Sequence, residues 1–120
     1  MPEKGFHYLT HCKEQYAVIE LVGELNKLAE ETLLGVTDWK AVSNEVKSIV
    51  FDFTRVEYIN SAGISIVIRL IRSANDEGLL LFGFGINNLQ EKLFRAVGIS
   101  EYIMFYPDEF SIAERLKTVG

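Results

Sequence analysis

The sequence predicts an α/β fold in which one small, mixed but mostly parallel β-sheet is packed with about four α-helices. Short apolar runs alternate along the chain with segments whose apolar residues recur at helical spacing. The chain has 120 residues, of which 48% are hydrophobic, so it can build one proper core. Neither a repeat nor a Gly/Ser-rich linker interrupts it, and we therefore expect one domain over residues 1–120.

The first two elements are expected to form a β-hairpin. Residues 6–12 alternate loosely and contain Phe, Tyr and Thr, and residues 16–22 are rich in β-branched and apolar side chains. The few residues around Gln15 separate the two runs, as a hairpin connection requires. Gly23 is expected to end the second strand.

A helix is predicted over residues 27–46, with a break or kink near Gly35. Its apolar positions recur at helical spacing and are Leu28, Thr32, Leu33, Val36 and Trp39. The next run, residues 48–53, is short and apolar and is typical of a parallel strand that is buried on both faces. Residues 54–59 are then expected to form a loop, anchored to the core through Val56 and Ile59.

For residues 61–76, β propensity and hydrophobic periodicity predict different structures. The β-branched run 64–68 favours a strand. However, one helical face collects Ile64, Val67, Ile68, Ile71 and Ala74, and the opposite face collects Ser65, Arg69, Arg72 and Asp76. Because this division lasts four turns, the sequence predicts a helix, with Asn60 as its N-cap and Gly78 after its end.

The remaining chain repeats the strand and helix pattern. Residues 79–84 read as a strand, and a helix follows that Asn87 and Gln90 open at capping-box spacing. Gly98 suits the position after that helix, residues 103–106 read as a short strand, and a last helix starts at residues 107–108. The inward residues expected on these two helices are Leu89, Leu93 and Val97 on the first, and Phe110, Ala113 and Leu116 on the second. Strands that alternate with helices pair in parallel through right-handed crossovers.

The composition excludes several classes of function. The net charge of −5 disfavours binding to nucleic acid and docking on anionic membranes, which both depend on Lys and Arg. Cys12 is the single cysteine, so the chain has no internal disulfide and suits a reducing compartment. The N-terminus lacks the pattern of a signal peptide, and no apolar run reaches the ~20 residues that span a bilayer. We expect a cytoplasmic protein that does not insert into membranes and is a monomer or a weak dimer.

No arrangement of residues indicates catalysis, a cofactor or a metal site. On a strand, His7 and His11 would share a face but lie ~13 Å apart at ~3.3 Å per residue, too far to hold one ion. Gly83 and Gly85 lack the third glycine of a dinucleotide-binding loop and indicate a tight turn. A receiver domain would need, besides Asp52, an acidic pair near its start and a lysine after a later strand, and this sequence has neither. We therefore interpret Asp52 as a structural residue near a turn. We therefore expect that the protein is not an enzyme.

Several segments in order resemble one known family, the STAS-domain anti-sigma-factor antagonists of bacteria. The signature is an apolar strand with an Asp near its end, a short loop, and an Asp-Ser-(Ser/Thr/Ala)-Gly-Leu run that opens a helix; here it matches residues 49–53, Val56 and residues 58–64. Residues 23–25 resemble the family's turn after the second strand, residues 78–83 its next strand, and residues 93–99 its Leu-Thr-Gly-Leu segment. Each match is weak alone, but their order and spacing make the resemblance specific from residue 16 onward.

The resemblance implies partner switching. The unmodified protein would bind an anti-sigma factor, usually a serine kinase, and so release a sigma factor. The kinase would then phosphorylate a signature serine and the complex would dissociate, until a phosphatase resets it. Carried onto this chain, the acceptor is Ser61, because the second hydroxyl position is Ala62. The expected partner-binding residues are Gly23, Glu24, Leu25, Asn26, Asn60, Ser61, Ala62, Gly63, Ile64, Ser65, Gly83 and Asn87.

Two positions depart from the family pattern. Asn60 and Asn26 stand where the signature and the earlier turn have Asp, so each removes a negative charge but keeps a hydrogen-bonding side chain. Asn caps helices about as well as Asp, so the fold should survive. These changes favour an alternative, a phosphorylation-independent STAS subunit of a larger assembly, such as a stress-signalling scaffold or a transporter accessory.

Overall fold

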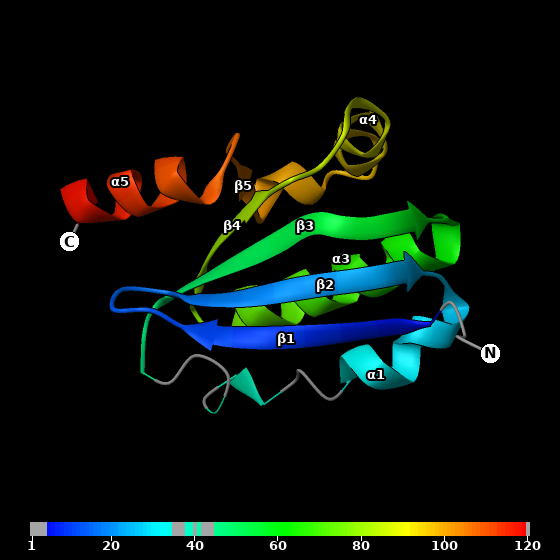
Figure 1. Cartoon of the computed structure of the whole chain (residues 1–120), viewed down its shortest axis with the longest axis horizontal. Coiled ribbons are helices and arrows are strands. Elements are labelled where there is room, and N and C mark those ends of the chain that lie inside the picture. Colours follow the sequence, from blue (N-terminus) through cyan, green and yellow to red (C-terminus); the bar gives the residue numbers. More distant parts are fainter. Residues whose placement is uncertain (1–4, 35–37, 40, 42–44, 120) are drawn as a thin grey trace.

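The computed structural model describes residues 5–34, 38, 39, 41 and 45–119. Their elements are, in order, β1 (Phe6–Cys12), β2 (Ala17–Leu25), the short 3-10 helix η1 (Lys27–Ala29), α1 (Glu30–Leu34), β3 (Ser48–Ile59), α3 (Ser61–Asp76), β4 (Leu80–Phe84), α4 (Asn88–Ala96), η3 (Ile99–Glu101), β5 (Met104–Phe105) and α5 (Glu109–Val119). Figure 1 shows the strands as one twisted sheet.

The sheet has the strand order β1-β2-β3-β4-β5. β1 and β2 pair antiparallel, and β2, β3, β4 and β5 pair in parallel. The predicted mixed, mostly parallel sheet is therefore confirmed, as is the N-terminal hairpin. Because β2, β3 and β4 run in the same direction, their carboxyl ends meet at one edge of the sheet, on the right in Figure 1.

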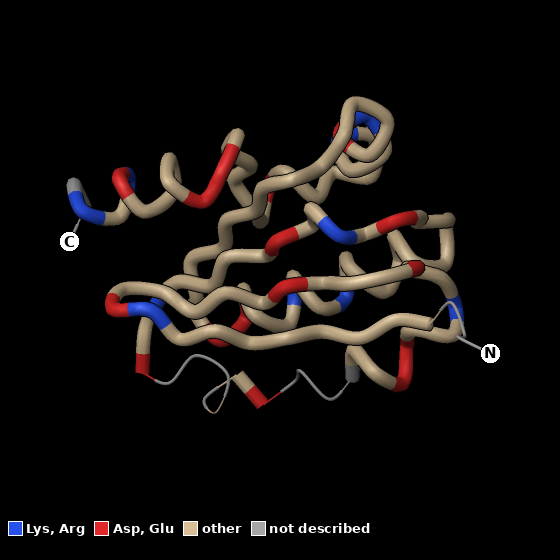
Figure 2. Tube along the Cα trace, in the orientation of Figure 1, with Lys and Arg blue, Asp and Glu red and all other residues tan. Residues whose placement is uncertain are grey.

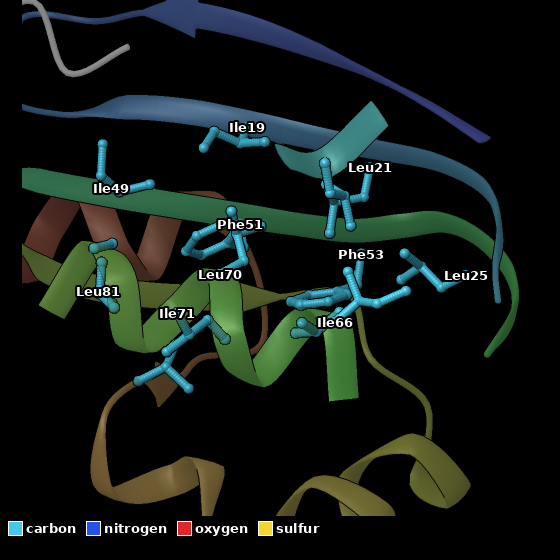
Figure 3. Close-up of a cluster of buried hydrophobic side chains, with 14 of the residues drawn as sticks. Ile19, Leu21, Leu25, Ile49, Phe51, Phe53, Ile66, Leu70, Ile71 and Leu81 are labelled. Carbon is cyan, nitrogen blue, oxygen red and sulfur yellow. The ribbon is translucent and has the colours of Figure 1, made fainter. Parts of the chain in front are cut away.

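Two apolar clusters hold the helices on the sheet. On one face, side chains from β2 and β3 meet α3, and Figure 3 shows Ile19, Phe51 and Phe53 pointing toward Ile66 and Leu70. On the other face, α5 packs on the sheet through the buried residues Val18, Val50, Phe82, Ile112 and Leu116. Tyr16 of this cluster also makes a hydrogen bond to α5, since its hydroxyl donates to Oε2 of Glu109 at 2.7 Å.

The helix over residues 61–76 forms as periodicity predicts, with Asn60 as its N-cap. Its buried face is wider than the predicted stripe, because Ile66 and Leu70 are buried together with Ile64, Val67 and Ile71. The β-branched run is thus helical because burial of this face outweighs intrinsic strand propensity. Within the described part of the chain, no helix is long and apolar enough to cross a membrane.

Two boundaries of the predicted strands were wrong. Residues 54–59 are not a loop but the second half of β3, which pairs with β2 up to Ile59. β4 stops opposite Asp52, so within the described ranges this half of β3 pairs with β2 alone. Gly23 does not end the second strand either: β2 continues through it to Leu25, with a register irregularity between Gly23 and Glu24.

The predicted inner stripes of two helices were wrong in part, although Leu116 is buried and Leu93 and Ala113 pack against the core as predicted. On α4, Gln90 and Phe94 are buried, whereas Leu89 is 66% exposed and Val97 is exposed too. On α5, the inward residues are Ile112 and Leu116, and Phe110 is 72% exposed. In the first helical segment Leu28 is 85% exposed, whereas Leu33 and Trp39 are buried as predicted. The predicted break near Gly35 and the position of Val36 lie outside the described residues.

Candidate functional site

Ser61 is the first residue of α3 and is exposed. The preceding residue, Asn60, has an extended backbone, and its Oδ1 accepts a hydrogen bond from the backbone N–H of Gly63 at 2.9 Å. The backbone N–H of Ile64 donates to the carbonyl oxygen of Asn60, also at 2.9 Å. The helix therefore begins at a defined residue, and the hydroxyl of Ser61 lies at the positive end of a 16-residue helix.

The start of α3 is fixed against the end of β2. The backbone N–H of Asn60 donates to the carbonyl oxygen of Leu25 at 3.2 Å. Gly63 packs so closely that a Cβ there would overlap this oxygen and lie 2.5 Å from the carbonyl carbon of Leu25. The glycine of the signature is thus required by the close approach of two backbones. This contact sets the position of Ser61 relative to the loop after β2.

Asn26 is a second cap beside the first. It follows Leu25 directly, and its Oδ1 accepts from the backbone N–H of Leu28 at 2.9 Å at the start of η1. Both positions at which the chain departs from the family's acidic pattern are therefore N-caps. An amide oxygen makes the same hydrogen bond as a carboxylate oxygen, so the substitutions keep the local structure and remove two negative charges near Ser61.

The segment after β4 forms the third part of this edge. Gly85 has a φ of +86° and lies against the backbone of Thr54, so this position requires glycine. The predicted tight turn does not form, and residues 85–87 are an irregular link between β4 and α4. Asn87 is exposed and forms a capping box with Gln90: Oδ1 of Asn87 accepts from the backbone N–H of Gln90 at 2.8 Å, and Oε1 of Gln90 accepts from the backbone N–H of Asn87 at 3.1 Å. Parallel pairing brings this segment to the same edge of the sheet as Ser61.

The structure separates the predicted partner-binding residues into two layers. Those with exposed or half-buried positions are Gly23, Glu24, Asn26, Asn60, Ser61, Ala62, Ser65 and Asn87. Leu25, Gly63, Ile64 and Gly83 are buried. Gly83 is covered by the ring of Phe105, to whose strand it pairs. These four residues support the surface from beneath and offer no side chain to a partner.

Sequence reasoning missed three exposed apolar side chains at this edge of the sheet. They are Leu28 on η1, Tyr58 near the end of β3, and Leu89 in the first turn of α4. Helical periodicity had placed Leu28 and Leu89 in the core, and Tyr58 had been considered only as part of the family signature. The available signal was position, because each follows or ends a strand at the same edge. Exposed large apolar residues favour contact with a protein.

Other candidate sites have simpler structural roles. Oδ1 of Asp52 accepts from the backbone N–H of Thr54 at 2.8 Å, so this carboxylate stabilises the middle of β3. In the described ranges of the chain, no group of three or more His, Cys, Asp or Glu residues could hold a metal ion.

Comparison with known proteins identifies the family. A family model described as the STAS domain matches residues 8–112, and the chain therefore belongs to the STAS family, as the resemblance predicted. No curated protein matches the sequence. The similar solved structures include a Ser-to-Glu variant of RsbS from Moorella thermoacetica, with a TM-score of 0.76 and 15% identity over 93% of this chain and 96% of that chain.

Two further structures share the fold. An anti-sigma factor antagonist from Mycobacterium paratuberculosis superimposes with a TM-score of 0.73 and 14% identity, covering 97% of both chains. The Bacillus cell fate determinant SpoIIAA in its phosphorylated form gives a TM-score of 0.65 and 20% identity, covering 89% of this chain and 97% of that chain. At such identities, the likeness establishes the fold.

Proposed function

We propose that this chain is an anti-sigma-factor antagonist that acts by partner switching under the control of Ser61. In its unmodified form it binds an anti-sigma factor that is also a serine kinase. Phosphorylation of Ser61 by that kinase dissociates the complex, and a phosphatase resets it. The observation that carries this proposal is the exposure of Ser61 at the first position of a helix whose start is fixed against β2.

The chemistry of the site fits a switch without refolding. A phosphate adds about −1.5 to −2 charges, which the free N–H groups and the dipole of a helix start tolerate. Asn26 and Asn60 add no negative charge beside it. The consequence of the modification therefore falls on the partner, whose surface meets the new charge. A repulsion of ~3 kcal/mol would weaken the complex about a hundredfold.

The exposed apolar residues give the partner a place to bind. Leu28, Tyr58 and Leu89 lie at the edge of the sheet that presents Ser61. Large apolar side chains commonly supply the binding energy of a protein interface, and a charge at its centre disrupts it. The similar structures support this role, since they include anti-sigma factor antagonists and one protein in a phosphorylated form. We propose accordingly that the chain is a regulatory binding protein of the cytoplasm and has no catalytic activity.

The experiment is a capture from native lysate with three tagged forms of the chain. The wild type, Ser61→Ala and Ser61→Asp serve as baits, and retained proteins are identified by mass spectrometry. We expect the first two to retain one anti-sigma kinase and Ser61→Asp to lose it. The purified kinase with ATP-Mg should then add one phosphate to the wild type and none to Ser61→Ala, as measured by intact mass. Unmodified wild-type protein after that reaction would refute the kinase switch.

A second candidate function has its own support. The neutral side chains of Asn26 and Asn60 at acidic positions of the signature favour a STAS subunit that binds constitutively in a larger assembly, such as a stress-signalling scaffold or a transporter accessory complex. In that case all three baits would retain the same partners. Size-exclusion chromatography of the native complex would also show the chain in a large assembly before and after treatment with phosphatase.

A further inference from the structure

Among the residues that the structure describes, no strand pairs with the outer edge of β1. β1 ends the strand order of the sheet and pairs only with β2, in a continuous register. Its sequence contains neither proline nor Lys, Arg, Asp or Glu, and Figure 2 shows this strand free of those charges along its length. The central residue, Leu9, is 43% exposed. Natural edge strands usually carry such charges, prolines or bulges to prevent pairing with another chain. β1 has none of these devices.

The hydrogen bonds show which residues of β1 can accept another strand. The backbone N–H of Glu24 donates to the carbonyl oxygen of Gly5 at 3.3 Å, and that of Lys13 to the carbonyl oxygen of Tyr16 at 2.8 Å. Residues 5 and 13 therefore stand at hydrogen-bonded positions, and alternation places residues 7, 9 and 11 there too. The N–H and C=O groups of residues 6, 8, 10 and 12 consequently point to the outer edge.

The two histidines of β1 are placed symmetrically about the centre of the strand. His7 and His11 lie two residues on either side of Leu9, the centre of β1. A second copy that pairs antiparallel along all seven residues of β1 must place Leu9 opposite its equivalent. His7 of each copy then lies opposite His11 of the other, at positions without mutual hydrogen bonds. There Cα atoms are ~4.5 Å apart and the side chains are closest.

Each chain already holds two groups at the spacing of zinc ligands. Nε2 of His11 lies 3.2 Å from Oε1 of Glu20, while the other oxygen of Glu20 is held by Arg55 at 3.3 Å. Two ligands of a tetrahedral zinc ion, each with a bond of ~2.0 Å, are separated by about 3.3 Å. His7 of the same chain is ~13 Å from His11 along the strand and cannot join them. One copy thus offers an incomplete site.

We propose that zinc joins two copies of this chain through β1, with His7 of one copy and His11 and Glu20 of the other as ligands. The two-fold symmetry creates two such sites on either side of the Leu9 pair. Imidazole and carboxylate ligands select zinc over the oxygen-seeking ions Mg²⁺ and Ca²⁺. Each histidine binds as the neutral ring. A standard interface takes about 20–30 residues from each partner, whereas β1 offers seven, so the dimer depends on the metal.

The first experiment measures mass by analytical ultracentrifugation of the full chain under reducing conditions. With EDTA or with MgCl₂ we expect a monomer. With ZnCl₂ we expect twice that mass, and calorimetry should give one zinc per chain. A monomer at saturating zinc would overturn the proposal, as would a dimer of equal stability in EDTA. Cys12→Ser is the matched control for an exposed zinc-binding side chain on the same strand, and it should still dimerise.

The second experiment tests whether the ligands come from two copies. His7→Asn and His11→Asn change exposed side chains, so both variants should fold, and each alone should stay monomeric with zinc. An equimolar mixture keeps one complete site, made of His7 from one variant and His11 from the other. We expect it to form a dimer with one zinc per two chains. Failure of the mixture to dimerise would overturn the proposed pairing. The result is independent of the partner switch at Ser61.

Discussion

Replacing Gly63 by alanine tests how the start of α3 is held in place. A Cβ at this position would lie 2.5 Å from the carbonyl carbon of Leu25 and 3.0 Å from its Cβ, besides overlapping the carbonyl oxygen. The obstacle is backbone, which cannot rotate away as a flexible side chain can. Relief requires α3 to move from β2, and that movement stretches the hydrogen bond from Asn60 to Leu25, now 3.2 Å long.

The magnitude follows from three opposing effects. Overpacking in a close contact costs about 1–3 kcal/mol. Loss of one backbone hydrogen bond costs ~1 kcal/mol, and the better helix propensity of alanine returns ~1 kcal/mol. The last two effects cancel, so we expect Gly63→Ala to lower the free energy of unfolding by about 1–3 kcal/mol, equivalent to a fall in Tm of roughly 3–15 °C for a chain of this size.

Urea denaturation followed by circular dichroism measures this change. Gly5→Ala is the matched control, because nothing lies within 4 Å of a Cβ there and its backbone has an ordinary φ. The control should unfold within ~0.5 kcal/mol of the wild type. If Gly63→Ala proved as stable as the wild type, the close contact with Leu25 would not determine where Ser61 lies, and our explanation of the signature glycine would be wrong.

Three further predictions concern the cap, the phenol and the revised helix face. Asn60→Ala should cost ~1 kcal/mol in chemical denaturation, whereas Asn60→Asp should keep the wild-type stability, because only the former loses the cap. Burial and the hydrogen bond to Glu109 raise the pKa of Tyr16 to about 12. Since this exceeds the value of 10.0 for a free phenol, the stabilisation is complete below pH 10 and disappears as the pH rises toward 12. An absorbance titration of the wild type should show one tyrosine that ionises later than the others, and this late step should be missing in Tyr16→Phe. Leu89→Ser should change the unfolding free energy by less than ~0.5 kcal/mol, but Phe94→Leu should cost more than ~1 kcal/mol; equal effects would contradict the assignment of the buried face of α4.

The sequence was most informative where a long pattern or a cap left one interpretation. Four turns of consistent amphipathicity over residues 61–76 outweighed the β propensity of residues 64–68, and the structure has a helix there. Asn87 and Gln90 form the capping box that their spacing predicted. In both cases the signal is local, since it depends on residues within a few positions of one another.

Prediction failed where neighbours in space decide the outcome. In the nine-residue helix α4, the stripes 89, 93, 97 and 90, 94 differ by one position, or about 100° around the axis. Packing of Phe94 against Phe53 and Phe105 selects the second stripe, and these contacts are remote in sequence. Residues 54–59 likewise look polar enough for a loop, yet they form a strand because β2 extends beside them.

The site was predictable in part for the same reason. The signature fixed Ser61 and its cap, both local features. The burial of Leu25 and Gly83, and the exposure of Leu28 and Leu89 at the same edge, depend on how β2, β3 and β4 end together. The order of strands and helices in one sequence predicts that these segments lie at the edge, but which of their side chains face outward depends on neighbours in space.

The measurement that bears most directly on the role of residue 61 compares two properties of the same preparation. The kinase-modified chain and its unmodified form are titrated against the purified partner, and their thermal unfolding is recorded side by side. We predict an affinity loss of about a hundredfold together with a Tm that changes by no more than ~2 °C, because the phosphate meets the partner and not the core. Unchanged affinity, or a loss of affinity that merely accompanies unfolding, would contradict a switch located on an intact surface.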